Sequence, residues 1–196
     1  TIVGYSWGAL LALLYAAEAA RERSLPTPAR LVLVDPAPLT REFRRQFEQE
    51  FARRQASADV QRLRVELADS GLRESDPEAY RHRNFELSVA GYFLDPAKAR
   101  DLTPFRVTSR VQQSVCESLG DFDLMADGTL SSVTVPALIL HGRQDPIPLA
   151  SSQAAAKAMG NNAELAIIED CGHVPYVEQP DALFAHIDSW LRRPIP

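Results

Sequence analysis

The chain has 196 residues, of which 45% are apolar and 24% are charged, and its formal net charge at pH 7 is −5. This composition is typical of a soluble globular protein with room for one sizeable core. The acidic balance argues against nucleic acid or an anionic membrane surface as the main partner, and no apolar run reaches the roughly 20 residues of a membrane span. Cys116 and Cys171 lie too far apart in the sequence to suggest a disulfide framework, so we expect a reducing, cytoplasmic location.

The first eight residues predict a strand, a tight turn and a helix. Gly4-Tyr5-Ser6-Trp7-Gly8 follows a β-rich opening and precedes an apolar helical run that ends near Glu22. So sharp a reversal requires strained dihedrals at its apex and no side chains at Gly4 and Gly8. The turn would hold the Ser6 hydroxyl at the positive end of the helix, where developing negative charge is stabilised. We interpret Ser6 as a nucleophile; the alternative is a chance Gly-x-Ser-x-Gly in a loop.

A buried parallel strand is predicted after this helix. Residues 30–34 read Arg-Leu-Val-Leu-Val, an apolar run typical of a parallel strand that is covered on both faces. A strand, a helix and a second strand in this order form a right-handed parallel crossover. Asp35 ends the strand in an Asp-Pro turn. We therefore assign residues 1–38 to the first part of an α/β core.

Residues 39–130 are interpreted as a helical cap inserted over the sheet. Up to about residue 119 the pattern is helical, charged and free of buried-strand runs, and it includes helices predicted from Asp76 to about Phe93 and over residues 104–119. Three phenylalanines recur every four residues and share one helical face: Phe43, Phe47 and Phe51. We expect this stripe either to pack the cap against the core or to line a substrate pocket.

Residues 131–196 return to the pattern of the core. The elements predicted there are a buried parallel strand over residues 135–142, a helix from Pro148 to Met159 that ends at Gly160, a last strand over residues 163–169, and an amphipathic helix from Gln179 to Trp190.

The catalytic hypothesis depends on three residues that each follow a parallel strand. A serine hydroxyl is a poor nucleophile near neutral pH, so it needs a base, and the base needs an orienting acid. Asp145 and His173 both lie just past the end of a predicted strand, as Ser6 does. Because ligands bind at that edge of an open α/β sheet, the three are expected to meet there. Ser6 would attack an acyl carbon, His173 would shuttle the proton, and Asp145 would fix the imidazole tautomer.

Three motifs in this order resemble those of the α/β-hydrolase superfamily: Gly4-Tyr5-Ser6-Trp7-Gly8, His141-Gly142-x-x-Asp145-Pro146-Ile147 and Gly172-His173-Val174-Pro175-x-x-Glu178-Gln179-Pro180. The resemblance runs from Thr1 to about Leu191 and is weakest in the cap. The Ser-Trp-Gly turn with a cap of this length is most similar to the proline iminopeptidase-like branch. The resemblance implies a parallel sheet flanked by helices and a cofactor-free serine hydrolase with Ser6, Asp145 and His173 as its triad.

The resemblance also implies earlier strands and a His-Gly-Gly-type loop whose amide completes the oxyanion hole, and nothing in the chain matches that loop. The Trp7 amide is expected to serve as one oxyanion donor. Because the chain begins without Met and inside a strand, we expect a fragment that a missing N-terminal segment or a second chain completes. Alone it is expected to be inactive, since losing one oxyanion donor costs on the order of 3–4 kcal/mol.

Several residues are alternatives to these assignments. Asp35 is the rival acid because it too ends a parallel strand, although Asp145 fits the family motif better. His141 is expected to be structural, Glu178 to hold the final turn, and Cys171 to be a buried thiol. No metal site is predicted, because the chain has no two-His helix pair, no Cys-x-x-Cys and no carboxylate cluster.

The expected reaction is hydrolysis of a small ester, an amide or an N-terminal peptide bond through an acyl-enzyme, with a small molecule or a short peptide as substrate. A proline-type aminopeptidase is placed narrowly ahead of a carboxylesterase. An aminopeptidase needs an anionic clamp for the free amine of its substrate, and Glu74, Asp76 and Glu86 in the cap are candidates. The alternative from another class is a non-catalytic binding protein that keeps the hydrolase fold.

Overall fold

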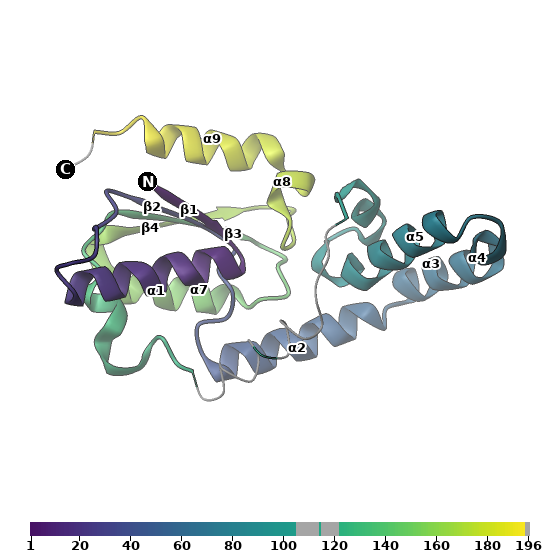
Figure 1. Ribbon diagram of the computed structural model, residues 1–196, viewed down its shortest axis with the longest axis horizontal. Helices are drawn as coiled ribbons and strands as arrows, with labels where there is room; N and C mark the ends of the chain where they lie inside the picture. The colour runs from purple at the N-terminus through teal and green to yellow at the C-terminus, as the bar shows by residue number, and fades with distance from the viewer. Residues whose placement is uncertain (105–113, 115–121, 195–196) are drawn as a thin grey trace.

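The computed structural model describes residues 1–104, 114 and 122–194. In this part of the chain the sheet has four parallel strands in the order β1-β2-β3-β4: β1 (Ile2–Tyr5), β2 (Leu31–Val34), β3 (Ala137–Gly142) and β4 (Ala163–Ile168). Ile2 pairs with Leu31, which pairs with Ala137, which in turn pairs with Ala163. The carboxyl ends therefore share one edge of the sheet (Figure 1). This confirms the predicted α/β fold with a parallel sheet.

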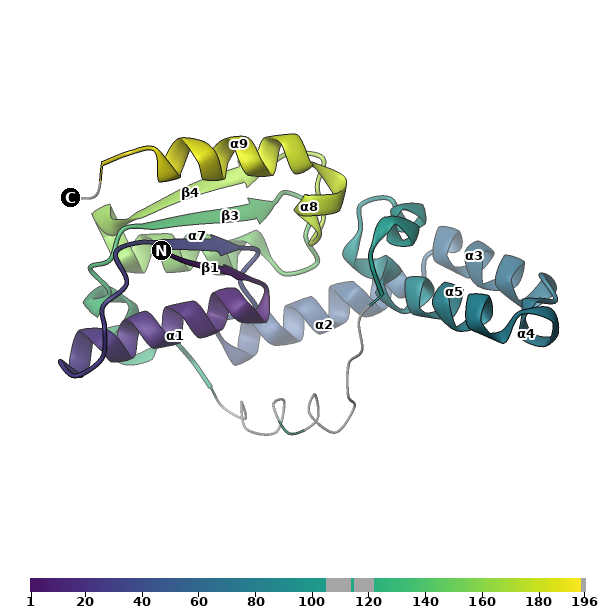
Figure 2. The same cartoon turned by 45° about the horizontal axis from the view of Figure 1, so that its top comes forward.

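Helices cover both faces of the sheet. Helices α1 (Trp7–Arg21) and α7 (Leu149–Met159) lie on one face, and α9 (Pro180–Leu191) lies on the other (Figures 1 and 2). The four residues of β2 are all buried, since Leu31 and Leu33 pack toward α1 whereas Val32 and Val34 pack with Trp190 of α9. Successive side chains of a strand point to opposite faces. A strand covered on both faces must therefore be apolar at every position, as the sequence of β2 is.

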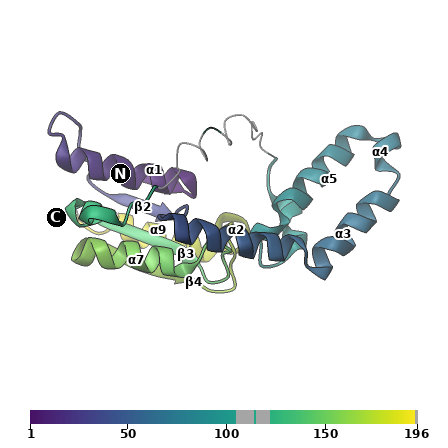
Figure 3. The same cartoon turned by 90° about the horizontal axis from the view of Figure 1, so that it is seen from below.

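The cap begins after β2 with four helices: α2 (Arg41–Gln55), α3 (Ala58–Asp69), α4 (Leu72–Ser75) and α5 (Pro77–Val89). Helices α3 to α5 project beyond the carboxyl edge of the sheet, and α3 and α5 run side by side (Figure 3). The Asp76 side chain caps α5 by accepting a hydrogen bond from the Ala79 amide at 3.0 Å. The helix predicted from Asp76 to Phe93 thus starts as expected but gives way after Val89 to a 3₁₀ turn.

One further helix of the cap was not predicted, and one predicted helix lies mostly outside the described residues. Helix α3 was not predicted as a separate element, although Ser57 accepts a hydrogen bond from the Val60 amide as its N-cap. The helix predicted over residues 104–119 lies, apart from residues 104 and 114, outside the described residues. The described residues continue from residue 122. The Leu124 amide donates to Leu39 O at 2.8 Å, and Leu124 packs in the core on the face of the sheet that α1 covers.

The cap is fastened to the loop that follows β4. Its apolar cluster includes Val60, Val89 and Phe93, together with Val174, which directly precedes the short helix α8 (Pro175–Glu178). The loop after β4 is therefore packed against the cap as well as against the sheet. Within the described ranges, no helix combines the length and the apolarity needed to cross a membrane.

Candidate active site

Ser6 lies at the turn between β1 and α1 in a backbone conformation that residues other than glycine rarely adopt, with φ 52° and ψ −115°. Backbone hydrogen bonds hold it there. The Ser6 amide donates to Val34 O at 2.9 Å, and Ser6 O accepts from the Leu10 and Ala37 amides at 3.2 and 3.1 Å. The Ser6 side chain makes no capping hydrogen bond to α1, so its hydroxyl is available to another partner.

The two glycines of the turn are not equivalent. A Cβ added at Gly4 would lie 2.3 Å from Gly8 O and 2.5 Å from Ala9 N, which are backbone atoms of the helix that packs on the strand. Apart from its chain neighbours and the backbone of its own helix, a Cβ added at Gly8 would meet no atom of the described residues within 4 Å. The prediction that both positions must lack a side chain is therefore correct for Gly4 and wrong for Gly8. The turn is tight on its strand side only, since the Cα–H of Gly8 faces open space.

The His173 imidazole lies between the other two members of the predicted triad. Its Nε2 is 3.0 Å from Ser6 Oγ, and its Nδ1 is 2.7 Å from Asp145 Oδ2. A carboxylate only accepts hydrogen bonds, so we assign the imidazole proton to Nδ1, which leaves Nε2 to accept the Ser6 hydroxyl proton. The structure thus brings together three side chains from three separate loops at the carboxyl edge of the sheet, and the two partners of Ser6 are buried.

Asp145 is oriented by its own loop. Its amide donates to Gly142 O at 3.0 Å, which closes a turn immediately after β3. Its Oδ1 accepts a hydrogen bond from the Ile147 amide at 2.7 Å, and its Oδ2 faces the imidazole. Both carboxylate oxygens therefore have a donor, and the oxygen that receives the imidazole proton is fixed by the bond that the other oxygen makes.

His173 is held from two sides by tyrosines. Its amide donates to Tyr92 O at 2.8 Å, and its carbonyl accepts from the Tyr5 hydroxyl at 2.9 Å. The Tyr5 and Tyr92 rings also lie 5.3 and 5.0 Å from the imidazole, centroid to centroid. Tyr5 comes from the strand that carries the nucleophile, whereas Tyr92 comes from the cap. Neither role was predicted from the sequence, although the position of Tyr5 next to Ser6 was a signal for its role.

The aromatic stripe of α2 reaches this tyrosine. The Phe51 ring lies 4.5 Å from the Tyr92 ring and the Phe47 ring 6.0 Å from it, and the two phenylalanines contact each other at 5.7 Å. Of the two roles considered for the stripe, these contacts favour packing. The packed partner is the residue that contacts the imidazole, so the stripe supports the position of His173.

Burial dominates the electrostatics of the site. It lowers the pKa of His173 to about 4, because removal from water disfavours the imidazolium ion. It raises the pKa of Asp145, and the hydrogen bond from the Ile147 amide opposes that shift. A neutral imidazole is the form that a general base requires. The site therefore keeps its base ready to accept a proton over a wide range of pH.

Asp35, the rival acid, does not reach the imidazole by a hydrogen bond. Its Oδ1 accepts from the Gly142 amide at 2.8 Å, so the side chain ties the end of β2 to the end of β3. His141 is structural, as expected, since its Nε2 lies 3.1 Å from Ile147 O and its Nδ1 lies 2.9 Å from Ser152 Oγ. A carbonyl only accepts, so Nε2 carries the proton and Nδ1 accepts from the Ser152 hydroxyl. Burial lowers the pKa of His141 to about 4.

Three of these side chains lie close enough together to be considered as metal ligands. Asp35, His141 and Asp145 each bring one possible ligand atom within 4.8 Å of the other two. However, both ring nitrogens of His141 and both oxygens of Asp145 are already engaged in hydrogen bonds. A metal ion would have to displace these bonds, so this donor set does not fit a resident metal.

Glu178 joins the loop of His173 to the cap. Its Oε2 accepts from the Gly172 amide at 2.8 Å and its Oε1 from the Leu94 amide at 2.7 Å, and the side chain is buried. The expectation that Glu178 holds the final turn is therefore confirmed, and the contact with the cap is an addition to it. Cys171 is a buried thiol, and burial raises its pKa well above the ordinary value, so it is not a reactive thiolate.

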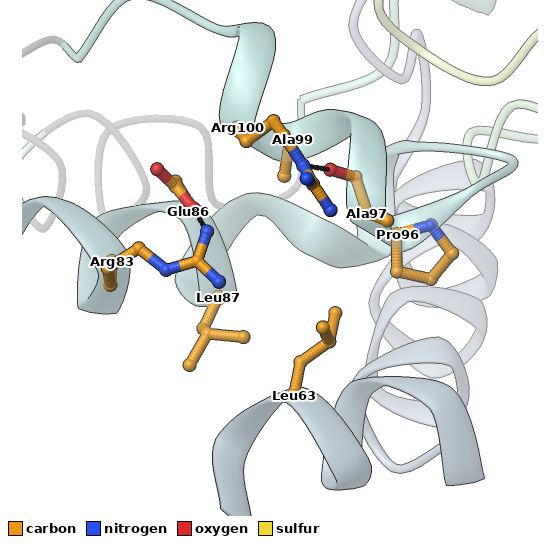
Figure 4. Close-up of a pocket in the computed structure, with 8 residues that line it drawn as sticks. All are labelled: Leu63, Arg83, Glu86, Leu87, Pro96, Ala97, Ala99 and Arg100. Atoms are coloured by element: carbon orange, nitrogen blue, oxygen red, sulfur yellow. Dashed lines mark hydrogen bonds and ion pairs between the residues drawn. The ribbon is translucent and has the colours of Figure 1, made fainter. Parts of the chain in front are cut away.

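The cap contains a small cavity (Figure 4), and none of the three triad residues lines it. Its volume of about 10 Å³ holds at most one water molecule. Arg83 and Glu86 line it, and their ion pair has an N···O distance of 2.5 Å. The other lining residues are Leu63, Leu87, Pro96, Ala97, Ala99 and Arg100. This cavity is too small for a substrate.

Comparison with known proteins identifies the family and the fold of the chain. The chain is 34% identical over 65 residues to a pimeloyl-acyl-carrier-protein methyl ester esterase from Nitrosospira multiformis, a match that covers 33% of this chain and 25% of that protein. An alpha/beta fold family hydrolase from Bacillus anthracis str. Sterne superposes with a TM-score of 0.63 at 20% identity, and the match covers 95% of this chain and 65% of that one.

A proline iminopeptidase from Mycobacterium smegmatis superposes with a TM-score of 0.56 at 17% identity, over 96% of this chain and 63% of that one. Identities this low show a shared fold alone. The chain thus spans a little under two thirds of the length of these two structures. Residues 1–186 match the model of the alpha/beta hydrolase family, and the chain therefore belongs to that family.

Proposed function

We propose that this protein is a serine hydrolase that works through an acyl-enzyme, with Ser6 as nucleophile, His173 as base and Asp145 as orienting acid. The observation that carries the proposal is the unbroken series of contacts from Ser6 Oγ through the imidazole to Asp145 Oδ2, at 3.0 and 2.7 Å. In the first step Ser6 Oγ attacks the acyl carbon while Nε2 takes the hydroxyl proton, and the imidazolium then protonates the leaving group. Water, deprotonated by the same base, releases the acid and restores Ser6.

The oxyanion of the tetrahedral intermediate needs hydrogen-bond donors. The Trp7 amide is the donor proposed here, since Trp7 directly follows the nucleophile and begins α1. The positive end of the helix points to the same place, which adds a favourable partial charge.

Within this class we place an ester ahead of an N-terminal peptide as the substrate, which reverses the order given by the sequence alone. The named function of the Nitrosospira relative is ester hydrolysis. The carboxylates considered as an amine clamp are already committed, because Glu86 is paired with Arg83 and lies 3.6 Å from His82, and Asp76 caps α5. Glu74 lies exposed in α4, the short helix between α3 and α5. None of the three candidates supports the recognition of a free amine at Ser6.

The test uses the protein as its gene encodes it, with residues numbered as here. A fluorophosphonate probe should label the wild type, and the label should be found on Ser6 and be lost in Ser6→Ala. Ser88→Ala is the matched control, since Ser88 is an exposed serine of the cap whose hydroxyl donates to Phe85 O. Absence of labelling in the folded protein would support a non-catalytic binding protein instead.

Substrate class is decided by comparing two chromogenic substrates on the same preparation. We expect a short acyl ester to be cleaved faster, in kcat/KM, than a prolyl arylamide. Faster cleavage of the arylamide would restore the aminopeptidase hypothesis. Ser6→Ala should abolish both reactions, which excludes a contaminating hydrolase.

A further inference from the structure

Asp35 is a buried carboxyl group for which the catalytic proposal has no use. It lies at the carboxyl end of β2 with a φ of 43°, and none of its surface is exposed. Its Oδ1 accepts the Gly142 amide, whereas its Oδ2 is buried and has no hydrogen-bond donor among the described residues. A buried carboxylate with an unpartnered oxygen is strongly unfavourable. The environment of Asp35 therefore suits a carboxylic acid better than a carboxylate.

In the part of the chain that the structure describes, the groups around Asp35 offer it no positive charge. His141 is the nearest base, with its Nδ1 3.9 Å from Asp35 Oδ1, but that nitrogen accepts the Ser152 hydroxyl proton and the ring is neutral. The other titratable groups that act on Asp35 or feel its charge are Asp145, His173, Tyr5 and Cys171. Burial keeps the tyrosine, the thiol and both imidazoles uncharged. The remaining neighbour is another acid.

That acid is Asp145, and the two carboxyl groups have unequal partners. An oxygen of Asp35 and an oxygen of Asp145 lie within 4.8 Å of each other. Asp145 receives two hydrogen bonds, from the Ile147 amide and from His173 Nδ1, whereas Asp35 receives one. Two buried carboxyl groups this close do not both ionise readily, and the proton stays on the one whose charge is less well solvated. By this criterion Asp145 carries the charge and Asp35 the proton.

We propose that Asp35 is a positioning residue that remains a neutral carboxylic acid and donates its proton to the Asp145 carboxylate, holding Asp145 in place for His173. The proposal rests on the proposed role of Asp145. Burial, with the nearby charge of Asp145 second, raises the pKa of Asp35 well above its ordinary value. A hydrogen bond from Asp35 would lower the pKa of Asp145, in opposition to burial, which raises it. Asp35 thereby helps to keep the orienting acid charged.

The variant Asp35→Asn distinguishes a protonated Asp35 from an ionised one. In Asp35→Asn the side-chain carbonyl still accepts the Gly142 amide, and the NH₂ group still donates toward Asp145. A neutral asparagine therefore reproduces a protonated Asp35 but not an ionised one. Asp170→Asn is the matched control, because Asp170 is also an aspartate at the end of a strand with positive φ, 50°, but is exposed.

The experiment combines a pH profile with infrared spectroscopy on the complete protein. For Asp35→Asn we expect kcat/KM within about threefold of the wild type and an acid limb at the same pH, whereas Asp35→Leu should lose at least about tenfold. The wild type and Asp170→Asn should show a protonated-carboxyl band near pH 7 that Asp35→Asn lacks. A shift of the acid limb by about one pH unit in Asp35→Asn, or absence of the band, would overturn the proposal.

The infrared readout does not depend on catalysis. If Ser6 is not labelled by the fluorophosphonate probe but the band is present and lost in Asp35→Asn, the catalytic proposal fails while the neutral state of Asp35 stands. If labelling occurs and the band is absent, only the proposal for Asp35 fails. Should Asp35→Leu not fold, the asparagine variant decides alone.

Discussion

The two glycines of the turn around Ser6 allow a sharp test of how this fold positions its nucleophile. The same substitution, glycine to alanine, is expected to have opposite effects four residues apart. At Gly4 the new Cβ would lie 2.3 Å from a backbone oxygen and 2.4 Å from a backbone carbon of Gly8. Real Cβ contacts essentially never fall below 3.0 Å, so β1 and α1 would have to separate by roughly 0.7 Å along a closely packed interface.

The size of the effect follows from what would have to move. Helix α1 is fixed by buried contacts of Leu10 and Leu13 with the sheet, and β1 is fixed by its pairing with β2. Overpacking against backbone that cannot yield is expected to lower the free energy of unfolding by on the order of 3 kcal/mol in Gly4→Ala. Ser6 would be displaced as well, and a shift approaching 1 Å slows a reaction by about 100-fold. Labelling of Ser6 should fall accordingly.

Gly8→Ala is the internal control, because outside its own helix a Cβ there meets none of the described atoms within 4 Å, and position 8 lies in the first turn of α1. Alanine is the better helix former, so stability should be unchanged or rise by up to about 1 kcal/mol. Both variants are measured by urea denaturation and by the rate of fluorophosphonate labelling. If Gly4→Ala stays within about 0.5 kcal/mol of the wild type, or if Gly8→Ala is equally damaging, the account of the turn is wrong.

The remaining predictions concern the groups behind the nucleophile. Asp145→Asn should lower kcat by about 10⁴-fold in steady-state assays, since the imidazole tautomer is no longer fixed; a loss under tenfold would contradict the role of Asp145. Because burial lowers the pKa of His173 to about 4, kcat/KM should hold from pH 7 to about pH 5 and fall below it, whereas a midpoint near pH 6.5 would refute this. Folded wild type keeps the Asp35 proton that the unfolded chain releases above pH 3.8, so its stability falls as pH rises. In urea titrations the free energy of unfolding of Asp35→Asn should therefore rise relative to that of the wild type by about 1.4 kcal/mol per pH unit between about pH 4 and 7. A difference in unfolding free energy that does not change with pH would contradict a neutral Asp35. Glu178→Gln places an NH₂ group against a backbone amide, so denaturation should show a loss of about 1.5–3 kcal/mol; an unchanged stability would mean that the carboxylate does not hold the cap.

Much of the fold was predictable because local patterns determine its elements. The apolar runs of β2 and β3 indicate strands covered on both faces, and the turn around Ser6 is dictated by residues that are neighbours in the sequence. The N-cap of α5 was likewise visible as Asp76 before Pro77. Helix α3 was missed although Ser57 marks its start, since a charged helical pattern does not by itself show where one cap helix ends and the next begins.

Other properties of the site were decided only by the tertiary structure. The sequence proposed Ser6, Asp145 and His173 because each follows a strand, and parallel strands bring their ends together. It could not give the clamp on His173 by Tyr5 and Tyr92, nor the bond from Glu178 to the cap, since these join residues 81 to 168 positions apart. Burial and the number of donors around each oxygen are likewise properties of packing. Local sequence therefore determined which groups are present at this edge of the sheet, and three-dimensional packing decided their partners and, on our proposal, which of them carry charge.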